Sequence, residues 1–361
     1  GGQLPSGWHG ACWPYIFAKA KFIFYGAYPS EELWRVNLTY FVGAVLILWV
    51  MFDRLPFRKQ VGFVLLILYP IFATVMFTGG GFGVSKINVG LYTLLGLGLI
   101  TVGRIGKRGF LTSFFGDLSK LAEPSGWGLI FLAIFSVAIG ADFNLDRIDT
   151  RDWGGLLITL VVASVAIVAS LPLGIILALG RRSNMPVART ASIIFIEFWR
   201  GVPLITVLFM ASVMIPLFMP EGVNFDSFLR ALIGVTLWQS AYMAEVIRGG
   251  LQAIDRGQYE ASDAMGLTYW QSMRLVILPQ ALKHVLPGIV NTVISVFKDT
   301  TLVSIVGIFD LLGAAQSTLA DPSWASPVQG MTSYLAIALV LFFFCFGMSR
   351  YSMYVERKLD R

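Results

Sequence analysis

Long stretches without a charged side chain constrain this chain more than any other feature. Residues 36–52 and 61–77 are strongly apolar and carry no charge at all. A helix of about 20 apolar residues crosses the hydrocarbon core of a bilayer. Only helices and closed barrels satisfy their backbone groups there, and the alternating segments of about ten residues that a barrel needs are absent. The sequence therefore predicts an all-α polytopic membrane protein.

Hydropathy and charge divide the chain into segments. Only 13% of the residues are charged, about half the share that is usual in a soluble domain. Nine spans are predicted, near residues 36–52, 61–78, 88–103, 126–141, 153–179, 190–219, 228–247, 285–308 and 331–349. The expected segments are an external aromatic segment (1–35), N-terminal membrane helices (36–141), an external linker (142–152), a C-terminal core (153–349) with a polar loop (248–283), and a basic tail (350–361).

The basic residues predict the orientation, because Lys and Arg concentrate in the cytoplasmic loops of membrane proteins. If residues 1–35 face outward, 18 of the 27 basic residues fall inside and seven fall outside. The 248–283 loop and the C-terminal tail are then cytoplasmic. An odd number of spans with an external start also predicts a further span upstream of residue 1.

The 248–283 loop carries the most informative motif, which consists of Glu260, Ala261, Ser262, Gly266, Leu278 and Pro279 at fixed spacing. Two short helices are predicted, Gln258–Met265 and Thr268–Ile277, joined at Gly266 where a positive φ is tolerated and ended by Pro279. Their apolar surface would come from Tyr259, Met265, Leu267, Tyr269 and Trp270. A loop this long and aromatic indicates docking, and a solvated amphipathic connector is the simpler alternative.

This motif resembles the EAA signature of the membrane subunits of ABC importers, and we call residues 248–283 the EAA loop. Three further stretches, Glu197–Leu204, Ser240–Gly249 and Lys298–Ser304, resemble the E-x-x-R-G-x-P-L, S-A-Y-x-A-E-x-x-R-G and K-x-T-S-L-x-S segments of polar amino acid permeases. Residues 153–310 are thus similar to the histidine/glutamine/general L-amino-acid permease family. The extra N-terminal spans resemble its longer members. Ser262 and Thr301 are mild departures from the family pattern.

The resemblance implies a five-helix type I importer core preceded by about four additional helices, in a bacterial inner membrane. The implied partners are a second permease subunit in a heterodimer, two ATPase subunits, a periplasmic amino-acid-binding protein and membrane lipid. Residues 260–266 would sit in a cleft of the ATPase. ATP and magnesium would bind there and not to this chain, in which no G-x-x-x-x-G-K-[ST] segment occurs. No enzyme activity, catalytic residue, cofactor or metal site is expected of the chain itself.

Charged residues within or beside the spans are the candidates for a substrate path: Glu197, Arg200, Glu245, Lys298 and Asp299, with Thr301 nearby. Each charge costs about 2.5–3.5 kcal/mol at a helix centre, so such groups pair or line a cavity. The α-carboxylate and α-ammonium of an amino acid need partners of both signs. The alternative for Glu197 and Arg200 is a structural pair, because they are three residues apart on one helix. For Lys298 and Asp299 the alternatives are gating and packing.

The external segment is rich in aromatic residues, namely Trp8, Trp13, Tyr15, Phe17, Phe22, Phe24, Tyr25 and Tyr28. This pattern predicts a lid that lies on the membrane surface, with contact to a binding protein as the alternative.

Two other function classes compete with an ABC permease. An ion-driven secondary amino acid transporter would use Glu245, Lys298 and Asp299 as coupling groups, but it would not need the EAA loop and should show internal repeats. An intramembrane hydrolase would need a nucleophile and a base in a recognisable motif. The net charge of +6 does not indicate nucleic acid, because the basic residues form no single cluster.

Overall fold

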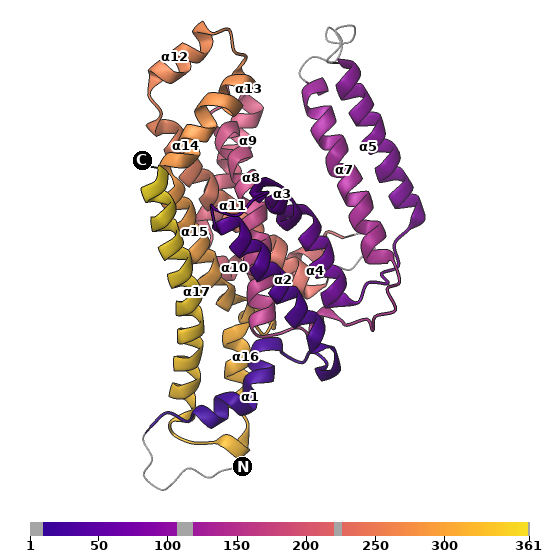
Figure 1. Cartoon of the computed structure of the whole chain (residues 1–361), viewed down its shortest axis with the longest axis vertical. Coiled ribbons are helices and arrows are strands. Elements are labelled where there is room, and N and C mark those ends of the chain that lie inside the picture. Colours follow the sequence, from indigo (N-terminus) through magenta and orange to yellow (C-terminus); the bar gives the residue numbers. More distant parts are fainter. Residues whose placement is uncertain (1–9, 107–117, 220–225, 360–361) are drawn as a thin grey trace. The chain divides into compact units, whose positions relative to one another are not determined.

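The structure, a computed structural model, describes residues 10–106, 118–219 and 226–359. These residues are nearly all helical, as predicted, and the chain divides into two compact units (Figure 1). The core unit comprises residues 1–28 and 151–361, and the N-terminal unit comprises residues 29–150. Trp8 of the aromatic segment lies outside the described ranges, as do Lys107, Arg108 and Arg361, which are among the basic residues counted above.

The N-terminal unit is built from long apolar helices. Its elements are η1 (Ser30–Glu32), α2 (Leu33–Met51), α3 (Arg58–Phe63), the π-helix η2 (Val64–Leu68), α4 (Tyr69–Thr78), α5 (Lys86–Gly106) and α7 (Leu118–Gly140). Helices α5 and α7 approach closely where Gly96 meets Gly126, and a Cβ added to Gly126 would lie 2.6 Å from the Gly96 carbonyl oxygen. Small residues at such crossings are typical of helix pairs in membranes.

The core unit contains the remaining elements. They are α1 (Trp13–Tyr25), α8 (Leu156–Arg181), α9 (Pro186–Gly201), α10 (Leu204–Leu217), α11 (Ser227–Ala253), α12 (Arg256–Ala264), α13 (Tyr269–Ser272), the π-helix η4 (Met273–Ile277), α14 (Leu278–His284), α15 (Leu286–Asp299), η5 (Thr300–Val306), α16 (Leu311–Thr318), η6 (Pro322–Trp324) and α17 (Gln329–Leu359). The short turn η3 (Thr150–Asp152) links the two units in sequence. Within this unit α12 and α13 lie at one end, and α1 and α16 lie at the other (Figure 1).

Each predicted span coincides with a helix or a run of helices. Among the described residues, seven helices are long and apolar enough to cross a membrane, or eight if α9 and α10 form one bent span. Helix α11 is the remaining one, and its polar side chains, including Gln239, Glu245 and Arg248, keep it below that apolar standard.

The sixth predicted span, 190–219, is not one straight helix. Helices α9 and α10 meet at an angle of 108°. Pro203 causes this break, because a proline disfavours the helical conformation in the residue before it. Val202 is accordingly extended, with φ −102° and ψ 128°. Pro203 was visible in the sequence, but the continuous apolar run of residues 190–219 led to the prediction of a single span.

Helix α1, which holds most of the aromatic residues of the external segment, packs into the core unit, and the lid on the membrane surface stays a prediction. Tyr15 and Tyr28 are fully buried. The Tyr15 hydroxyl shares a hydrogen bond of 2.5 Å with the Thr318 hydroxyl on α16. Where α1 ends, Gly26 lies against the backbone of Gly154, leaving no room for a side chain at either position. Trp13 and Phe17 are exposed, Phe17 at 79%, whereas Phe22, Phe24 and Tyr25 are partly buried and Phe24 packs against a core cluster.

Candidate functional site

The EAA loop folds as two short helices joined at Gly266, as predicted. Gly266 has φ +70°. Its N–H donates to the Asp263 carbonyl (2.9 Å), and the N–H of Leu267 donates to the Ser262 carbonyl (3.1 Å). These two bonds form the Schellman termination of a helix, which requires a left-handed residue at this position.

The two helices of the loop begin at capping residues. The Asp255 carboxylate accepts the Gly257 N–H (2.8 Å) and starts α12. Thr268 and Gln271 form a capping box that starts α13.

Pro279 does not end a helix, contrary to our expectation. It lies in the first turn of α14, which follows directly on the π-helix η4. A proline within a helical run loses one backbone hydrogen bond and crowds the carbonyl four residues earlier. The wider π turn just before Pro279 accommodates that crowding.

The EAA loop exposes several apolar side chains. Met265 is 79% exposed, and Tyr269 and Trp270 are each half exposed. Leu275 is exposed as well, although the motif did not single it out. Of the motif residues, Glu260, Ala261 and Gly266 are exposed and Ser262 is buried. The loop therefore presents apolar and acidic groups together on a surface that nothing in this chain covers within the described residues.

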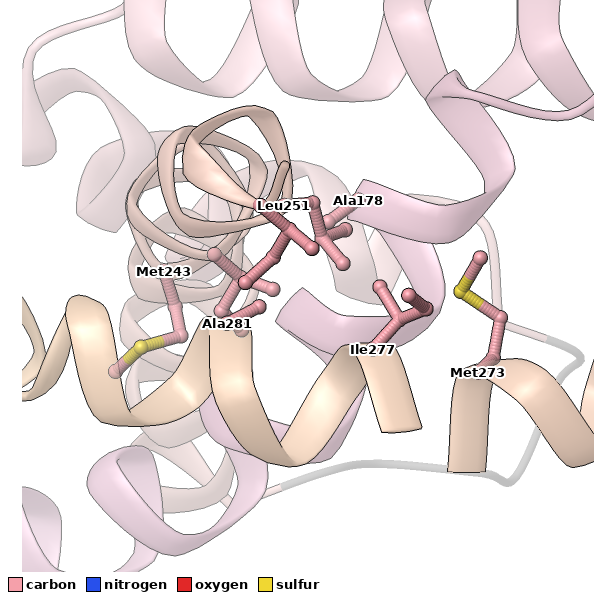
Figure 2. Packing of buried hydrophobic residues seen from close by; sticks show 8 residues of the cluster. Ala178, Met243, Leu251, Met273, Ile277 and Ala281 are labelled. Atoms are coloured by element: carbon pink, nitrogen blue, oxygen red, sulfur yellow. The ribbon is translucent and has the colours of Figure 1, made fainter. Parts of the chain in front are cut away.

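A hydrophobic platform joins the loop to the core helices, and we define it as Ala178, Met243, Ile247, Leu251, Ile254, Met273, Ile277 and Ala281. Seven of these residues come from α8, α11, η4 and α14, and Ile254 follows the end of α11. Figure 2 shows Leu251, Ile277 and Ala281 gathered between the helices. Because these side chains are almost fully buried, the second half of the loop is fixed to the ends of α8 and α11.

The embedded charges near α9 form an ion-pair cluster. Glu245 on α11 is its centre, with oxygens 3.0 Å from Arg181 Nη1, 3.5 Å from Arg200 Nη1 and 2.8 Å from Arg248 Nη2. Arg181 also pairs with Glu197 at 2.8 Å. Three arginines face two glutamates, so the cluster has an excess of one positive charge.

The predicted pair between Glu197 and Arg200 does not form. Glu197 instead binds Arg181, and Arg200 binds Glu245. The two residues share a helix, but α8 brings Arg181 to Glu197 and α11 brings Glu245 to Arg200. Arg200 has the longest of these contacts, and its guanidinium also lies 5.8 Å from the centre of the Tyr242 ring.

The remaining candidates lie on another element. Lys298 is exposed and Asp299 is half-buried at the end of α15, and the Thr301 hydroxyl donates to the Lys298 carbonyl (2.8 Å). Among the ion pairs of the described residues, none links these three to Glu245. The structure therefore separates the candidates into the cluster around Glu245 and a polar stretch on α15 and η5.

Three arginines of this region were not among the sequence candidates: Arg181, Arg182 and Arg248. Arg181 and Arg182 follow the apolar run of α8, where basic residues indicate the cytoplasmic side of a span. Because that role accounts for both residues, nothing in the sequence indicated contacts with other helices. Only the fold shows that they reach α11 and α12.

Comparisons with known proteins agree with this architecture. Residues 170–361 match the family model described as "Binding-protein-dependent transport system inner membrane component". The chain is 44% identical over 351 residues to the inner membrane amino-acid ABC transporter permease protein YhdY of Escherichia coli (strain K12), covering 97% of this chain and 78% of the relative. It is 45% identical to the glutamate/glutamine/aspartate/asparagine transport system permease protein BztC of Rhodobacter capsulatus, covering 98% of this chain and 80% of the relative.

A crystal structure of an amino acid ABC transporter with histidines is similar to the chain with a TM-score of 0.50 and 31% identity, over 56% of this chain and 92% of that one. The sequence matches and the helical architecture support the same family assignment. The chain belongs to the family of binding-protein-dependent transport system inner membrane components.

Proposed function

We propose that this chain is the permease subunit of an ATP-driven amino acid importer, that it forms half of the translocation path, and that its EAA loop docks on a separate ATPase. The observation that carries this proposal is the EAA loop itself. Its two capped helices rest on a buried apolar platform and present Met265, Tyr269 and Trp270 outward. A large exposed apolar patch beside charged groups marks a protein interaction site.

The transported class follows from the relatives and from the charges. Both near-full-length relatives are named as permeases for amino acids, and one name specifies glutamate, glutamine, aspartate and asparagine. An amino acid carries an α-carboxylate that an arginine can bind in a bidentate manner. The cluster has one arginine in excess, and Arg200 is the most weakly held of the three.

The second part of the proposed path is a polar face on α15. Asn291, Ser295 and Lys298 are all exposed and spaced by four and three residues on this spanning helix. An exposed lysine in lipid is costly, so such a residue faces a partner subunit or a water-filled path. We assign this face to the junction with the second permease subunit.

The remaining partners and the orientation are parts of the same proposal. The ATPase pair hydrolyses ATP, this chain binds no cofactor, and a periplasmic binding protein delivers the substrate. The EAA loop and the C-terminal tail face the cytoplasm, whereas α1 and α16 face the periplasm. Closure of the ATPases would move the loops and switch the permease pair between inward and outward access. The comparisons give no support to the ion-driven alternative.

The test is purification of the tagged chain from its native membrane, with and without a charge in the docking surface. We expect ATPase chains and a second permease to co-purify. Met265→Asp should release the ATPase, because it places a charge on the apolar contact. Leu359→Asp, an exposed apolar position in the tail, is the matched control. Purification of the unaltered chain without an ATPase would refute the proposal.

A further inference from the structure

One arginine joins the end of a core helix to the EAA loop. Arg182 follows α8, and its Nη1 donates both to the Leu251 carbonyl on α11 (2.8 Å) and to the Tyr259 hydroxyl on α12 (3.1 Å). The Tyr259 hydroxyl donates to the same carbonyl (3.2 Å). The guanidinium carbon also lies 5.7 Å from the centre of the Tyr259 ring. Three helices therefore meet at one oxygen atom.

This carbonyl needs partners from outside its own helix. Helix α11 ends at Ala253, and the last four carbonyls of a helix have no partner within it. A basic side chain commonly satisfies such groups. This contact differs from an ordinary cap, because Arg182 and Tyr259 both donate to the same carbonyl. The hydrogen bonds that satisfy the carbonyl therefore also connect α12 to α8.

Among the described residues, Tyr259 of α12 also packs against the platform, whereas the other side-chain hydrogen bonds from α12 to neighbouring helices stay within the loop. Ile254 is extended, with φ −74° and ψ 128°, so α11 and α12 are joined by a short link and not by a continuous helix. Gln280 Nε2 on α14 donates to Gln258 Oε1 (3.0 Å), and Ser262 bonds Ser272 (2.6 Å). Both of these bonds tie α12 to the rest of the loop, whereas the Arg182–Tyr259 contact ties it to α8.

The space beside this contact is not filled. A cavity of about 230 Å³ is lined by Leu179, Arg182, Leu251, Tyr259, Asp263 and Tyr269, among others. The polar contact between Arg182 and Tyr259 borders this cavity, where side chains are not close-packed. Tyr259 also packs against the platform, which includes Ala178 of α8, and its hydrogen bond with Arg182 adds a directed link between α12 and the end of α8.

We infer that Arg182 and Tyr259 form the joint through which movement of α12 is passed to α8 and α11. This inference rests on the proposed function, because it requires an ATPase on α12. Both are positioning residues, and the guanidinium supplies what a shorter or uncharged side chain lacks, namely two directed bonds and a stacking face.

The experiment uses the complete complex reconstituted in vesicles with its binding protein and radiolabelled glutamate and glutamine. Uptake and phosphate release are measured together. In Arg182→Gln and in Tyr259→Phe we expect unchanged ATPase content and continued ATP hydrolysis, while the amount of amino acid moved per ATP falls at least about fivefold, the lower end of typical coupling between sites. Arg182→Lys should be intermediate. Arg189→Gln, an exposed position on α9, is the control for loss of one positive charge nearby.

The outcomes separate the two proposals. If the unaltered complex lacks an ATPase or moves no amino acid, the proposed function fails and the joint with it. If the unaltered complex transports amino acids and both variants move as much amino acid per ATP as the Arg189→Gln control, only the inference about the joint is wrong. If the variants lose the ATPase, Arg182 shapes the docking surface and does not transmit movement, which also overturns the inference. Tyr259→Phe retains the ring and its packing, so it remains informative if Arg182→Gln folds poorly.

Discussion

At the scale of single residues, a glycine and an aspartate are constrained in different ways. Gly266 takes a left-handed conformation that terminates α12, and a Cβ added to it would meet no atom within 4 Å. A side chain at position 266 would therefore destabilise the protein only through the backbone conformation and not through a steric clash. Asp310, by contrast, is fully buried and caps α16 by accepting the N–H groups of Leu312 and Gly313.

Replacing Gly266 tests the turn between α12 and α13. Gly266→Val should destabilise the turn by about 1–2 kcal/mol or more, because left-handed backbone is unfavourable for residues with a Cβ and most of all for β-branched ones. We expect amino acid uptake to be uncoupled from ATP hydrolysis while membrane insertion is retained. Gly257→Ala, in the same loop without a positive φ, should transport normally. Normal uptake by Gly266→Val in reconstituted vesicles would contradict the assignment.

Asp310 should give the protein a pH-dependent stability. Burial raises the pKa of its carboxyl to about 6, although three backbone N–H groups oppose this shift. Between about pH 4 and 6 the folded chain holds a proton that the unfolded chain has lost, so the free energy of unfolding falls as the pH rises, by about 3 kcal/mol in total. Asp310→Asn keeps an oxygen for the cap and removes the titration. Its melting temperature, followed from pH 4 to 8, should lack that fall; parallel profiles for the two proteins would show that the shift is absent.

At the scale of elements, the EAA loop is held together by contacts between short helices that would not persist alone. Helix α13 has four residues and α12 has nine, and isolated helices of this length are marginal in water. The buried hydroxyls of Ser262 and Ser272 share a hydrogen bond of 2.6 Å, and Ser262 also donates to the Tyr259 carbonyl (2.8 Å). Ser262, which departs from the family motif, thus has a structural partner in the next helix.

A double-mutant cycle would measure this link. Ser262→Ala should destabilise the loop by about 1–2 kcal/mol, because it leaves the buried Ser272 hydroxyl without its partner. Adding Ser272→Ala should cost less than the sum of the single changes. Protease sensitivity of the loop in the purified complex reports these values. Ser183→Ala, combined with Ser262→Ala, should be additive, and equal additivity for Ser272 would argue against the bond.

At the scale of the whole molecule, the family match and the EAA loop both fall in the core unit. The matched residues 170–361 lie entirely within it, and the N-terminal unit of residues 29–150 precedes them in sequence. Helix α1 nevertheless belongs to the core unit, through the buried Tyr15 and the ion pair of Lys19 with Asp321 (2.5 Å). The core therefore uses residues from both ends of the chain.

Labelling from one side of the membrane tests the orientation. Cysteines at Asp149 and Asp226 should react with an impermeant thiol reagent added outside, whereas a cysteine at Arg256 should not, in a background without Cys12 and Cys345. The reason is the excess of basic residues on the side of Arg256. Labelling of Arg256 alone would reverse the proposed topology.

The sequence by itself determined the class of the protein, the positions of its spans and the turn at Gly266. These features depend on local properties: runs of apolar residues long enough for a bilayer, and a glycine at a motif position that needs positive φ. The family motifs could likewise be identified from the order and spacing of their residues. None of these inferences required knowing which helices are neighbours.

Only the tertiary structure decided the partners of the charged residues. Glu197 and Arg200 are close in sequence, yet each binds a residue from a different helix. Arg182 reaches α12 across 77 positions, and α1 packs against α16 across about 300. Such contacts depend on how the helices pack. A single sequence indicates which face of a helix is apolar, but it does not indicate which other helix packs against that face. The bend at Pro203 is intermediate, because its cause is local while its 108° angle is seen only in the structure, where α9 and α10 both pack against α11.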